Sequence, residues 1–386
     1  MDKKRQMNFN LNNFLLLLSN ALDEVEARYF NTSKNHSKRV AYLSLKFALE
    51  FNYKQDALFD ICAYSLMHNI ALSQEQEDKE KFCNLANEYA MRLPFDFKEQ
   101  EDVLKYQYES FDGSGPFNLK EYDIPLFSQF IYFANNIDTK FDLSKTLIEN
   151  RTKILAYIKE NENILFSSDL VECFEEFAQN QSFWLDLQNE NELLTFIFST
   201  LHDKTIVLDF EELLEISSIF TLLTNEDLNI IENASKVAQF YNFEHKDKQT
   251  FMIAASLCNI GKLYIDENIL NKENTLTKNE YEKVKAYPYY TKKILSNIIG
   301  FNDICSYAFK VQEQIDSKGY PFNLEAKDLS LKDRCLSLTN IYTSLRSNKS
   351  YRKAYSKNEA FNILEEMAKE KRVDITIVND FKEIFK

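Results

Sequence analysis

Glycine and proline are scarce in this chain, with five of each among 386 residues. These residues are the strongest breakers of helices, so long helices joined by helical connections are expected. Apolar residues recur at spacings of three and four, which is the period of an amphipathic helix. No segment alternates apolar and polar residues long enough to predict a sheet, and at most a small hairpin near Leu263–Ile265 is expected. The sequence therefore predicts an all-α protein.

Segments with helical periodicity cover most of the chain, and their apolar faces are predicted to form the core. In the first half they are 11–29, 36–51, 55–69, 126–138, 144–159 and 168–178. In the second half they are 206–222, 226–241, 247–259, 277–285, 289–298, 302–314, 330–346 and 357–369.

The composition excludes several classes of protein. A net charge of −14 disfavours binding to DNA or RNA, because the phosphate backbone would be repelled. The six cysteines form no CxxC pair and no zinc-type spacing, which predicts reduced thiols. The N-terminus has only five consecutive apolar residues, too few for a secretory core or a membrane span. A cytoplasmic protein without membrane insertion is expected.

Three stretches of the first half recur, in the same order, in the second half. The pairs are 49–70 with 239–260, 108–119 with 312–324, and 166–177 with 373–385. Such repetition predicts a duplication, although chance similarity between helical segments is an alternative. The predicted parts are a first domain over 8–180, a helical junction over 181–205 and a second domain over 206–386.

The stretch "ASLCNIGKLYIDENILNK" (255–272) has the layout of a site. Cys258 and Asn259 end an apolar helix, and a tight turn follows at Gly261. A thiol beside an amide is, however, a poor pair for acid–base chemistry or for a hard metal ion.

Residues 226–381 resemble the HD-GYP family, whose members carry a His-Asp pair followed by Ile-Gly-Lys, and later Gly-Tyr-Pro and Tyr-Arg-Lys-Ala. This chain has "CNIGK", "KGYP" and "YRKA" in that order. The first half resembles the same family through "HSKRVA", "LMHNI" and "DGSG". The resemblance implies an all-α fold of the HD superfamily. It also implies relatives that hydrolyse cyclic di-GMP on two or three iron or manganese ions.

The family's metal-ligand positions can be carried over to this sequence one at a time. In the first half they are His36, His68, Asn69, Cys83, Gln107, Tyr108 and Asn135. In the second half they are Glu226, Cys258, Asn259, Tyr287, Val311, Gln312 and Asn340. Amide, thiol and apolar groups cannot replace the carboxylates and imidazoles of a cation cluster. We therefore expect no cofactor, no dinuclear centre and no phosphodiesterase activity.

Other site residues are open to two interpretations. His36 and His68 could share one metal ion, or form a vestigial hydrogen-bonded pair. Two loops and one basic run could bind a nucleotide. The alternative is that the loops serve only as turns and the basic run only forms salt bridges. The residues are Asp112, Gly113, Ser114, Gly115, Lys318, Gly319, Tyr320, Arg352 and Lys353.

Two functional hypotheses follow from the resemblance. The favoured one is a catalytically inactive, degenerate tandem protein that binds other proteins as a scaffold or adaptor in bacterial signalling or motility. The alternative is a receptor that binds cyclic di-GMP without cutting it. A third hypothesis, an active cyclic di-GMP phosphodiesterase, conflicts with the replaced ligands.

Overall fold

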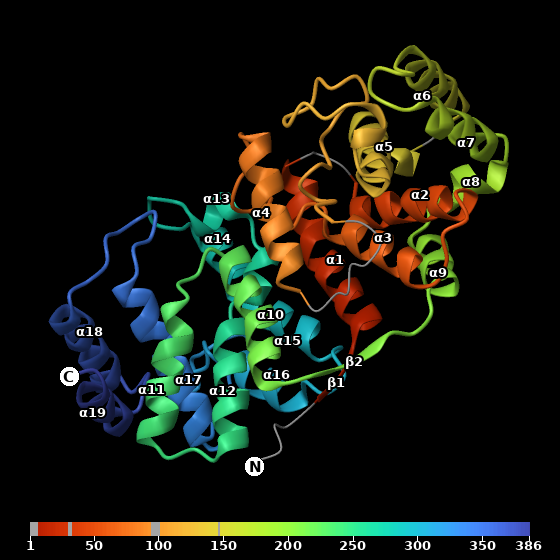
Figure 1. The fold of residues 1–386 in the computed structure, drawn as a ribbon. Helices are drawn as coiled ribbons and strands as arrows, with labels where there is room; N and C mark the ends of the chain where they lie inside the picture. The colour runs from red at the N-terminus through yellow and green to blue at the C-terminus, as the bar shows by residue number, and fades with distance from the viewer. Residues whose placement is uncertain (1–6, 30–32, 94–100, 146) are drawn as a thin grey trace. The chain divides into compact units, whose positions relative to one another are not determined.

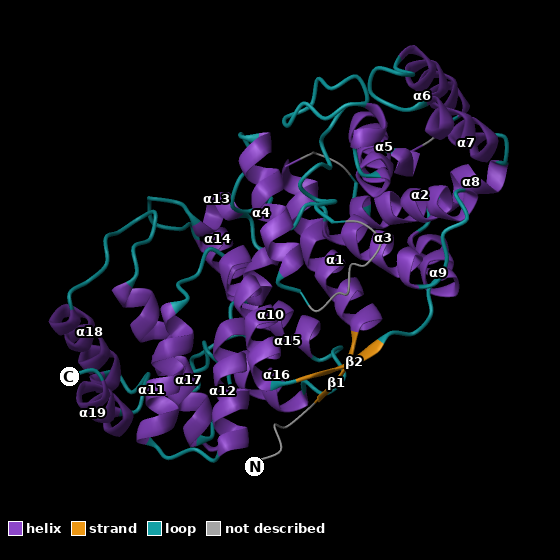
Figure 2. Cartoon of the chain, viewed as in Figure 1, coloured by secondary structure: helices purple, strands orange, loops and turns teal. Residues whose placement is uncertain are grey.

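The structure, a computed structural model, describes residues 7–29, 33–93, 101–145 and 147–386. Over these residues it is almost entirely helical, which confirms the all-α prediction (Figures 1 and 2). The chain divides into two compact units. We call Leu11–Lys204 the N-terminal unit, and Thr205–Lys386 together with Met1–Asn10 the C-terminal unit.

The N-terminal unit contains nine α-helices and two short 3-10 helices among its described residues. The α-helices are α1 (Leu11–Tyr29), α2 (His36–Glu50), α3 (Asp56–Met67), α4 (Lys79–Met91), α5 (Leu126–Phe141), α6 (Ile148–Glu160), α7 (Ser168–Ala178), α8 (Gln181–Asp186) and α9 (Glu190–Thr200). The 3-10 helices are Glu121–Asp123 and Leu143–Lys145.

Helix α2 forms the centre of this unit. Twelve of its fifteen residues are buried, and it packs against α1, α3, α5 and α9. On its apolar side, the ring of Phe47 lies 5.6 Å from that of Phe130 and 5.1 Å from that of Phe133. A helix surrounded on all sides must also bury its polar residues, and those need internal partners.

The C-terminal unit is built around α12 (His245–Leu257), which packs against α10, α11, α16 and α17. The other α-helices are α10 (Phe210–Leu223), α11 (Asn229–Phe240), α13 (Glu267–Leu270), α14 (Lys278–Lys285), α15 (Tyr287–Leu295), α16 (Asn302–Ala308), α17 (Leu331–Arg346), α18 (Lys357–Lys369) and α19 (Ile375–Ile384). The 3-10 helices are Ile260–Tyr264 and Ala326–Asp328. Helices α10, α14, α17 and α18 begin with complete capping boxes, which satisfy backbone N–H groups at their first turns.

Two short strands form an antiparallel ribbon in the C-terminal unit (Figure 2). Strand β1 (Met7–Asn10) pairs with β2 (Thr205–Leu208), with Met7 opposite Leu208. The fully buried ring of Phe9 lies 6.0 Å from the ring of Phe301, so the ribbon is fixed to the helical core.

The hairpin expected near Leu263–Ile265 is wrong, because that stretch continues a 3-10 helix that packs against α15. None of the described helices has the length and apolar character needed to cross a membrane.

Candidate functional site

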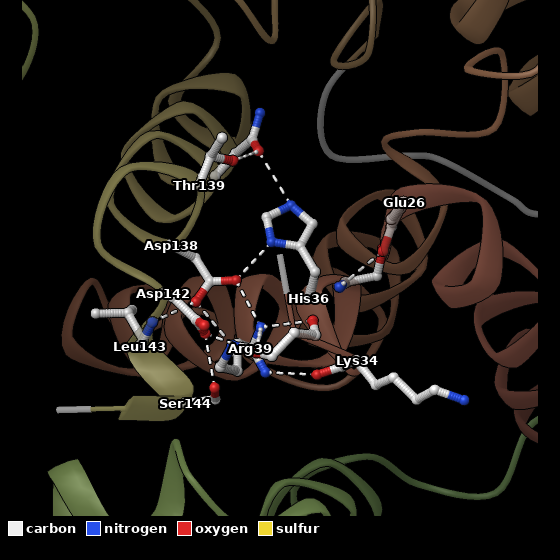
Figure 3. Close-up of polar contacts among 12 residues, drawn as sticks. Glu26, Lys34, His36, Arg39, Asp138, Thr139, Asp142, Leu143 and Ser144 are labelled. Atoms are coloured by element: carbon white, nitrogen blue, oxygen red, sulfur yellow. Dashed lines mark hydrogen bonds and ion pairs between the residues drawn. The ribbon is translucent and has the colours of Figure 1, made fainter. Parts of the chain in front are cut away.

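A buried ion-pair network joins α2 to α5 in the N-terminal unit (Figure 3). The Asp138 carboxylate lies 2.5 Å from His36 Nδ1 and accepts hydrogen bonds from Arg39 Nε and Nη2 at 2.7 and 2.9 Å. It also accepts the backbone N–H of Leu143 at 3.0 Å. The side chains of His36, Arg39 and Asp138 are at most 1% exposed.

The partners of His36 define its protonation state. Its Nε2 lies 3.1 Å from the amide oxygen of Asn135, and its Nδ1 faces Asp138, so both ring nitrogens face oxygen acceptors. Burial lowers the pKa of His36, but the hydrogen bond and the charge of Asp138 outweigh burial and raise it. Burial likewise opposes ionisation of Asp138, yet Arg39 and His36 hold its pKa well below its usual range. His36 is therefore an imidazolium paired with a carboxylate.

His68 lies next to His36 but has the opposite protonation preference. Its Nδ1–H donates to the Ser65 carbonyl at 2.7 Å, and its Nε2 accepts a hydrogen bond from Asn69 at 2.8 Å. The two imidazole rings are 5.3 Å apart. Complete burial lowers the pKa of His68 to about 4, so His68 is neutral at pH 7.

The two imidazoles are thus already engaged by protein groups, and a metal ion bound between them would have to replace those partners. Asn69 also donates to Glu26 at 3.0 Å, while its own Oδ1 has no hydrogen-bond partner among the described residues. No group of three or more His, Cys, Asp and Glu side chains within the described ranges is arranged to hold a metal ion. His36 and His68 are hydrogen-bonded to other protein groups, and both interpretations of the two histidines stay predictions.

The end of α12 carries the corresponding residues of the C-terminal unit. Asn259 Nδ2 donates to the Asn340 side-chain oxygen at 2.9 Å, and the Cys258 thiol lies 3.7 Å from the same oxygen. Burial raises the pKa of Cys258 to about 12, so its sulfur stays protonated. Asn259 Oδ1 lacks a hydrogen-bond partner in the described structure. One neutral oxygen and a thiol do not fit the iron or manganese cluster that the resemblance implies, since such ions need several anionic or imidazole ligands.

The turn after this helix is fixed by a close approach of backbone to backbone. A Cβ atom on Gly261 would lie 2.0 Å from the carbonyl oxygen of Tyr287, so only glycine fits there. The Gly261 N–H donates to Thr291 Oγ1 at 3.1 Å. This contact holds the next residue, Lys262, in position at a cavity.

That cavity of about 560 Å³ lies within the C-terminal unit and is lined by charged and aromatic side chains. Its polar and aromatic lining includes Glu226, Lys262, Lys272, Tyr287, Gln312, Tyr320, Lys349 and Tyr351. On one wall Gln312 Nε2 donates to the Tyr287 hydroxyl at 2.9 Å, and the Lys262 ammonium lies 5.2 Å from the Tyr287 ring centre. Below, we call it the lysine pocket.

Glu226 connects two of the lysines. Lys262 Nζ donates to Glu226 Oε1 at 2.5 Å, and Lys349 Nζ donates to Oε2 at 2.8 Å. The three side chains are 11–21% exposed. Burial alone would raise the pKa of Glu226, but the two ammonium groups outweigh it and lower that pKa. Two cations and one anion give this triplet a net charge of +1.

The two glycine loops have the same internal structure. Glu109 accepts hydrogen bonds from the amides of Phe117 and Leu119 at 2.6 and 2.7 Å, and Glu313 accepts two amides of its own loop at 2.8 and 2.9 Å. A Cβ on Gly319 would lie 2.4 Å from the Cα of Glu313, so close packing requires glycine. The first loop holds Asp112, Gly113, Ser114 and Gly115, and the second holds Lys318, Gly319 and Tyr320. Of these predicted nucleotide contacts, Tyr320 lines the lysine pocket.

The side chain of Arg352 is hydrogen-bonded to backbone carbonyl groups. Its guanidinium donates to the carbonyls of Ser344 and Leu345 at 2.7 and 3.2 Å, and it lies 4.9 Å from the ring centre of Tyr355. Lys353 is exposed next to it. The residues that line the pocket from this segment are instead Lys349 and Tyr351, which the sequence reasoning did not assign to a site. The basic run at 349–353 can be recognised in the sequence, but the neighbouring residues do not indicate which of its cationic side chains lines the pocket.

Comparisons with known proteins show what this chain is similar to. The HD domain model matches residues 210–377. The chain is 22% identical to 3'3'-cGAMP-specific phosphodiesterase 1 of Vibrio cholerae, over 93% of this chain and 88% of that protein. It is 26% identical to 3'3'-cGAMP-specific phosphodiesterase 3 of the same organism, over 67% of this chain and 57% of that protein. A shorter match, 31% identical over 29% of each chain, is to the cyclic di-GMP phosphodiesterase PdeB of Borreliella burgdorferi.

The fold is shared with a crystal structure of a cyclic GMP-AMP specific phosphodiesterase of V. cholerae. The TM-score is 0.65 at 18% identity, and the match covers 98% of both chains. Residues 210–377 thus match the HD domain model, and the chain has an all-α fold shared with that structure. The sequence is similar to those of phosphodiesterases of cyclic dinucleotides.

These comparisons contradict the expectation of an inactive scaffold or a non-cleaving receptor. Relatives that match along most of the chain are phosphodiesterases, and nothing in the comparisons supports a protein partner or a role in motility. The expectation of an inactive protein was wrong because it equated the replacement of metal ligands with the loss of activity. It did not consider that other charged side chains, such as Lys262 and Lys349, could line the same site. The degenerate and duplicated character of the chain stays a prediction.

Proposed function

We propose that the protein is a phosphodiesterase that takes a 3'3'-linked cyclic dinucleotide into the lysine pocket and opens its ring. The observation that carries the proposal is the pocket itself, a cavity of about 560 Å³ in the HD domain with lysines and tyrosines on its walls. Small-molecule sites commonly have volumes of roughly 300–1,000 Å³. The chain as a whole carries a net charge of −14, so a local cluster of ammonium groups is what an anionic ligand requires.

The chemical step is hydrolysis of one phosphodiester bond. The oxygen of a water molecule bonds to phosphorus, the bond from phosphorus to the 3' oxygen breaks, and that oxygen leaves with a proton as a hydroxyl group. The product is a linear dinucleotide with a 5'-phosphate. Lys262 and Lys349 would stabilise the charge that builds on the phosphate oxygens. Tyr287, Tyr320 and Tyr351 offer ring faces to the bases. A cytoplasmic location, expected from the sequence, stays part of this proposal.

The test is a cleavage assay with the full chain. 3'3'-cGAMP and cyclic di-GMP are incubated separately with the protein, and the linear products are separated by chromatography. Lys262→Met is expected to lower kcat about 100-fold, the usual effect of removing one group that stabilises developing charge. Lys327→Met, at a lysine that is 74% exposed and does not line the pocket, is the matched control. If the unmodified protein leaves both cyclic dinucleotides uncleaved, the proposal is refuted.

A further inference from the structure

Glu226, which was predicted from the sequence to stand at a metal-ligand position of the HD-GYP family, is engaged by two lysines. Each Glu226 oxygen accepts one ammonium N–H, from Lys262 at 2.5 Å and from Lys349 at 2.8 Å. A divalent cation that approached Glu226 would meet both ammonium groups at ion-pair distance. It would be repelled unless both lysines moved away.

We propose that Lys262 and Lys349, held in place by Glu226, form a seat for a phosphate group that works without a divalent metal. The identity of the ligand as a cyclic dinucleotide rests on the function proposed above, but the seat itself does not. Where relatives of this kind would use cations, this pocket supplies positive charge from side chains.

The geometry favours a phosphate at this point. A lysine ammonium has three N–H donors, and in the described structure Glu226 takes one from each lysine. The lysine side chains are 21% and 16% exposed, and both residues line the lysine pocket. In such partly buried surroundings the net charge of +1 on this triplet attracts an anion more strongly than it would at the surface, although Glu267 and Glu273 also line the pocket and oppose it.

Glu226 fixes the two long side chains, which would otherwise lose rotamer freedom on binding. Its negative charge also offsets the repulsion between the two ammonium groups, which can therefore lie close together. Gly261 contributes by fixing the backbone immediately before Lys262. Glu226 is therefore a positioning residue and does not itself contact the phosphate.

The experiment is isothermal titration of the full chain in excess EDTA with two probes, inorganic pyrophosphate and 3'3'-cGAMP. We expect Lys262→Met and Lys349→Met to weaken binding at least tenfold, whereas Lys262→Arg keeps the charge and most of the affinity. Glu226→Gln removes the anion and is expected to tighten binding about tenfold at low salt. The Lys327→Met control, which removes a charge outside the pocket, should bind like the unmodified protein.

If Glu226 were instead a metal ligand, Glu226→Gln would weaken binding of the two probes. If Glu226→Gln weakens binding, or if EDTA abolishes it, the seat depends on a cation and the inference is overturned. It is equally overturned if neither lysine variant changes the affinity. Circular dichroism of each variant separates loss of binding from loss of fold. Lysine-dependent binding of pyrophosphate would support the seat even if no cyclic dinucleotide is cleaved, so this result and failure of the proposed activity are distinguishable.

Discussion

Replacing Asp138 by asparagine should strongly destabilise the N-terminal unit. The carboxylate accepts two hydrogen bonds from Arg39, one from His36 and one from the Leu143 backbone, all away from water. The amide introduced by Asp138→Asn would be neutral, and its NH₂ group would face donors. His36 can respond by releasing its proton, but an arginine cannot be deprotonated in a protein. The Arg39 guanidinium would remain buried without a counter-charge.

Removing one partner of a buried ion pair costs about 3–5 kcal/mol of unfolding free energy. Whole domains are stable by only about 5–15 kcal/mol, so Asp138→Asn would remove a large part of that stability. Because the pKa of Asp138 is lowered in the folded protein, the unfolded state takes up a proton first as the pH falls. The stabilising effect is therefore complete at pH 7 and is lost progressively below about pH 4.

The assay is urea unfolding at pH 7, followed by the fluorescence of Trp184. This is the chain's single tryptophan, and it is 1% exposed within the N-terminal unit. Glu172→Gln on α7 is the control, because it removes one negative charge from an exposed position and should change the stability by less than about 0.5 kcal/mol. If Asp138→Asn and Glu172→Gln unfold at the same urea concentration, the argument that this network supports the unit is refuted.

Two further changes test other parts of the structure. The pKa of His68 is about 4 in the folded protein and near 6.5 when unfolded, so the unfolded state binds the proton first below pH 6.5. Unmodified protein should lose about 3 kcal/mol of stability between pH 6.5 and 4 from this group, and His68→Gln should show a correspondingly shallower dependence in the same fluorescence assay. Gly261→Ala would place a methyl group 2.0 Å from the Tyr287 carbonyl, and we expect it to lower the stability of the C-terminal unit by about 1–3 kcal/mol, measured by calorimetry. An unchanged melting profile would show that the turn relaxes easily.

The helices could be predicted from the sequence because their signals are local. Residues 330–346 and 357–369 were expected as helices, and the structure has Leu331–Arg346 and Lys357–Lys369, each beginning with a capping box. Helix α4 was missed, since polar residues weaken its apolar periodicity, and the short helix α13 was missed as well. Helices α8 and α9 lie in the stretch 181–205, which was predicted as a helical junction. The ribbon was also missed, because its two four-residue strands come from distant parts of the chain and neither has a pattern of its own.

The site was harder to predict because its partners are distant in the sequence. His36 was recognised, but Asp138, 102 residues away, was not, although it determines the charge of that histidine. Likewise Glu226 was compared with a histidine ligand, while Lys349, 123 residues further on, was noted only as part of a basic run with Arg352 and Lys353. A motif indicates which side chains are present, but it does not show which distant charges meet them.

The two units show why a list of replaced ligands is insufficient evidence about activity. In the N-terminal unit the two imidazoles that remain, His36 and His68, are fully buried and have protein partners. In the C-terminal unit the replaced positions lie beside an open cavity, and the carboxylate there is paired with ammonium groups rather than with an imidazole. Hydrolysis of a phosphodiester requires positive charge near the phosphate, and a metal ion and a pair of lysines can both supply it. The charged side chains that line a pocket, here including Glu226, Lys262 and Lys349, therefore belong to the evidence on activity beside the replaced ligands.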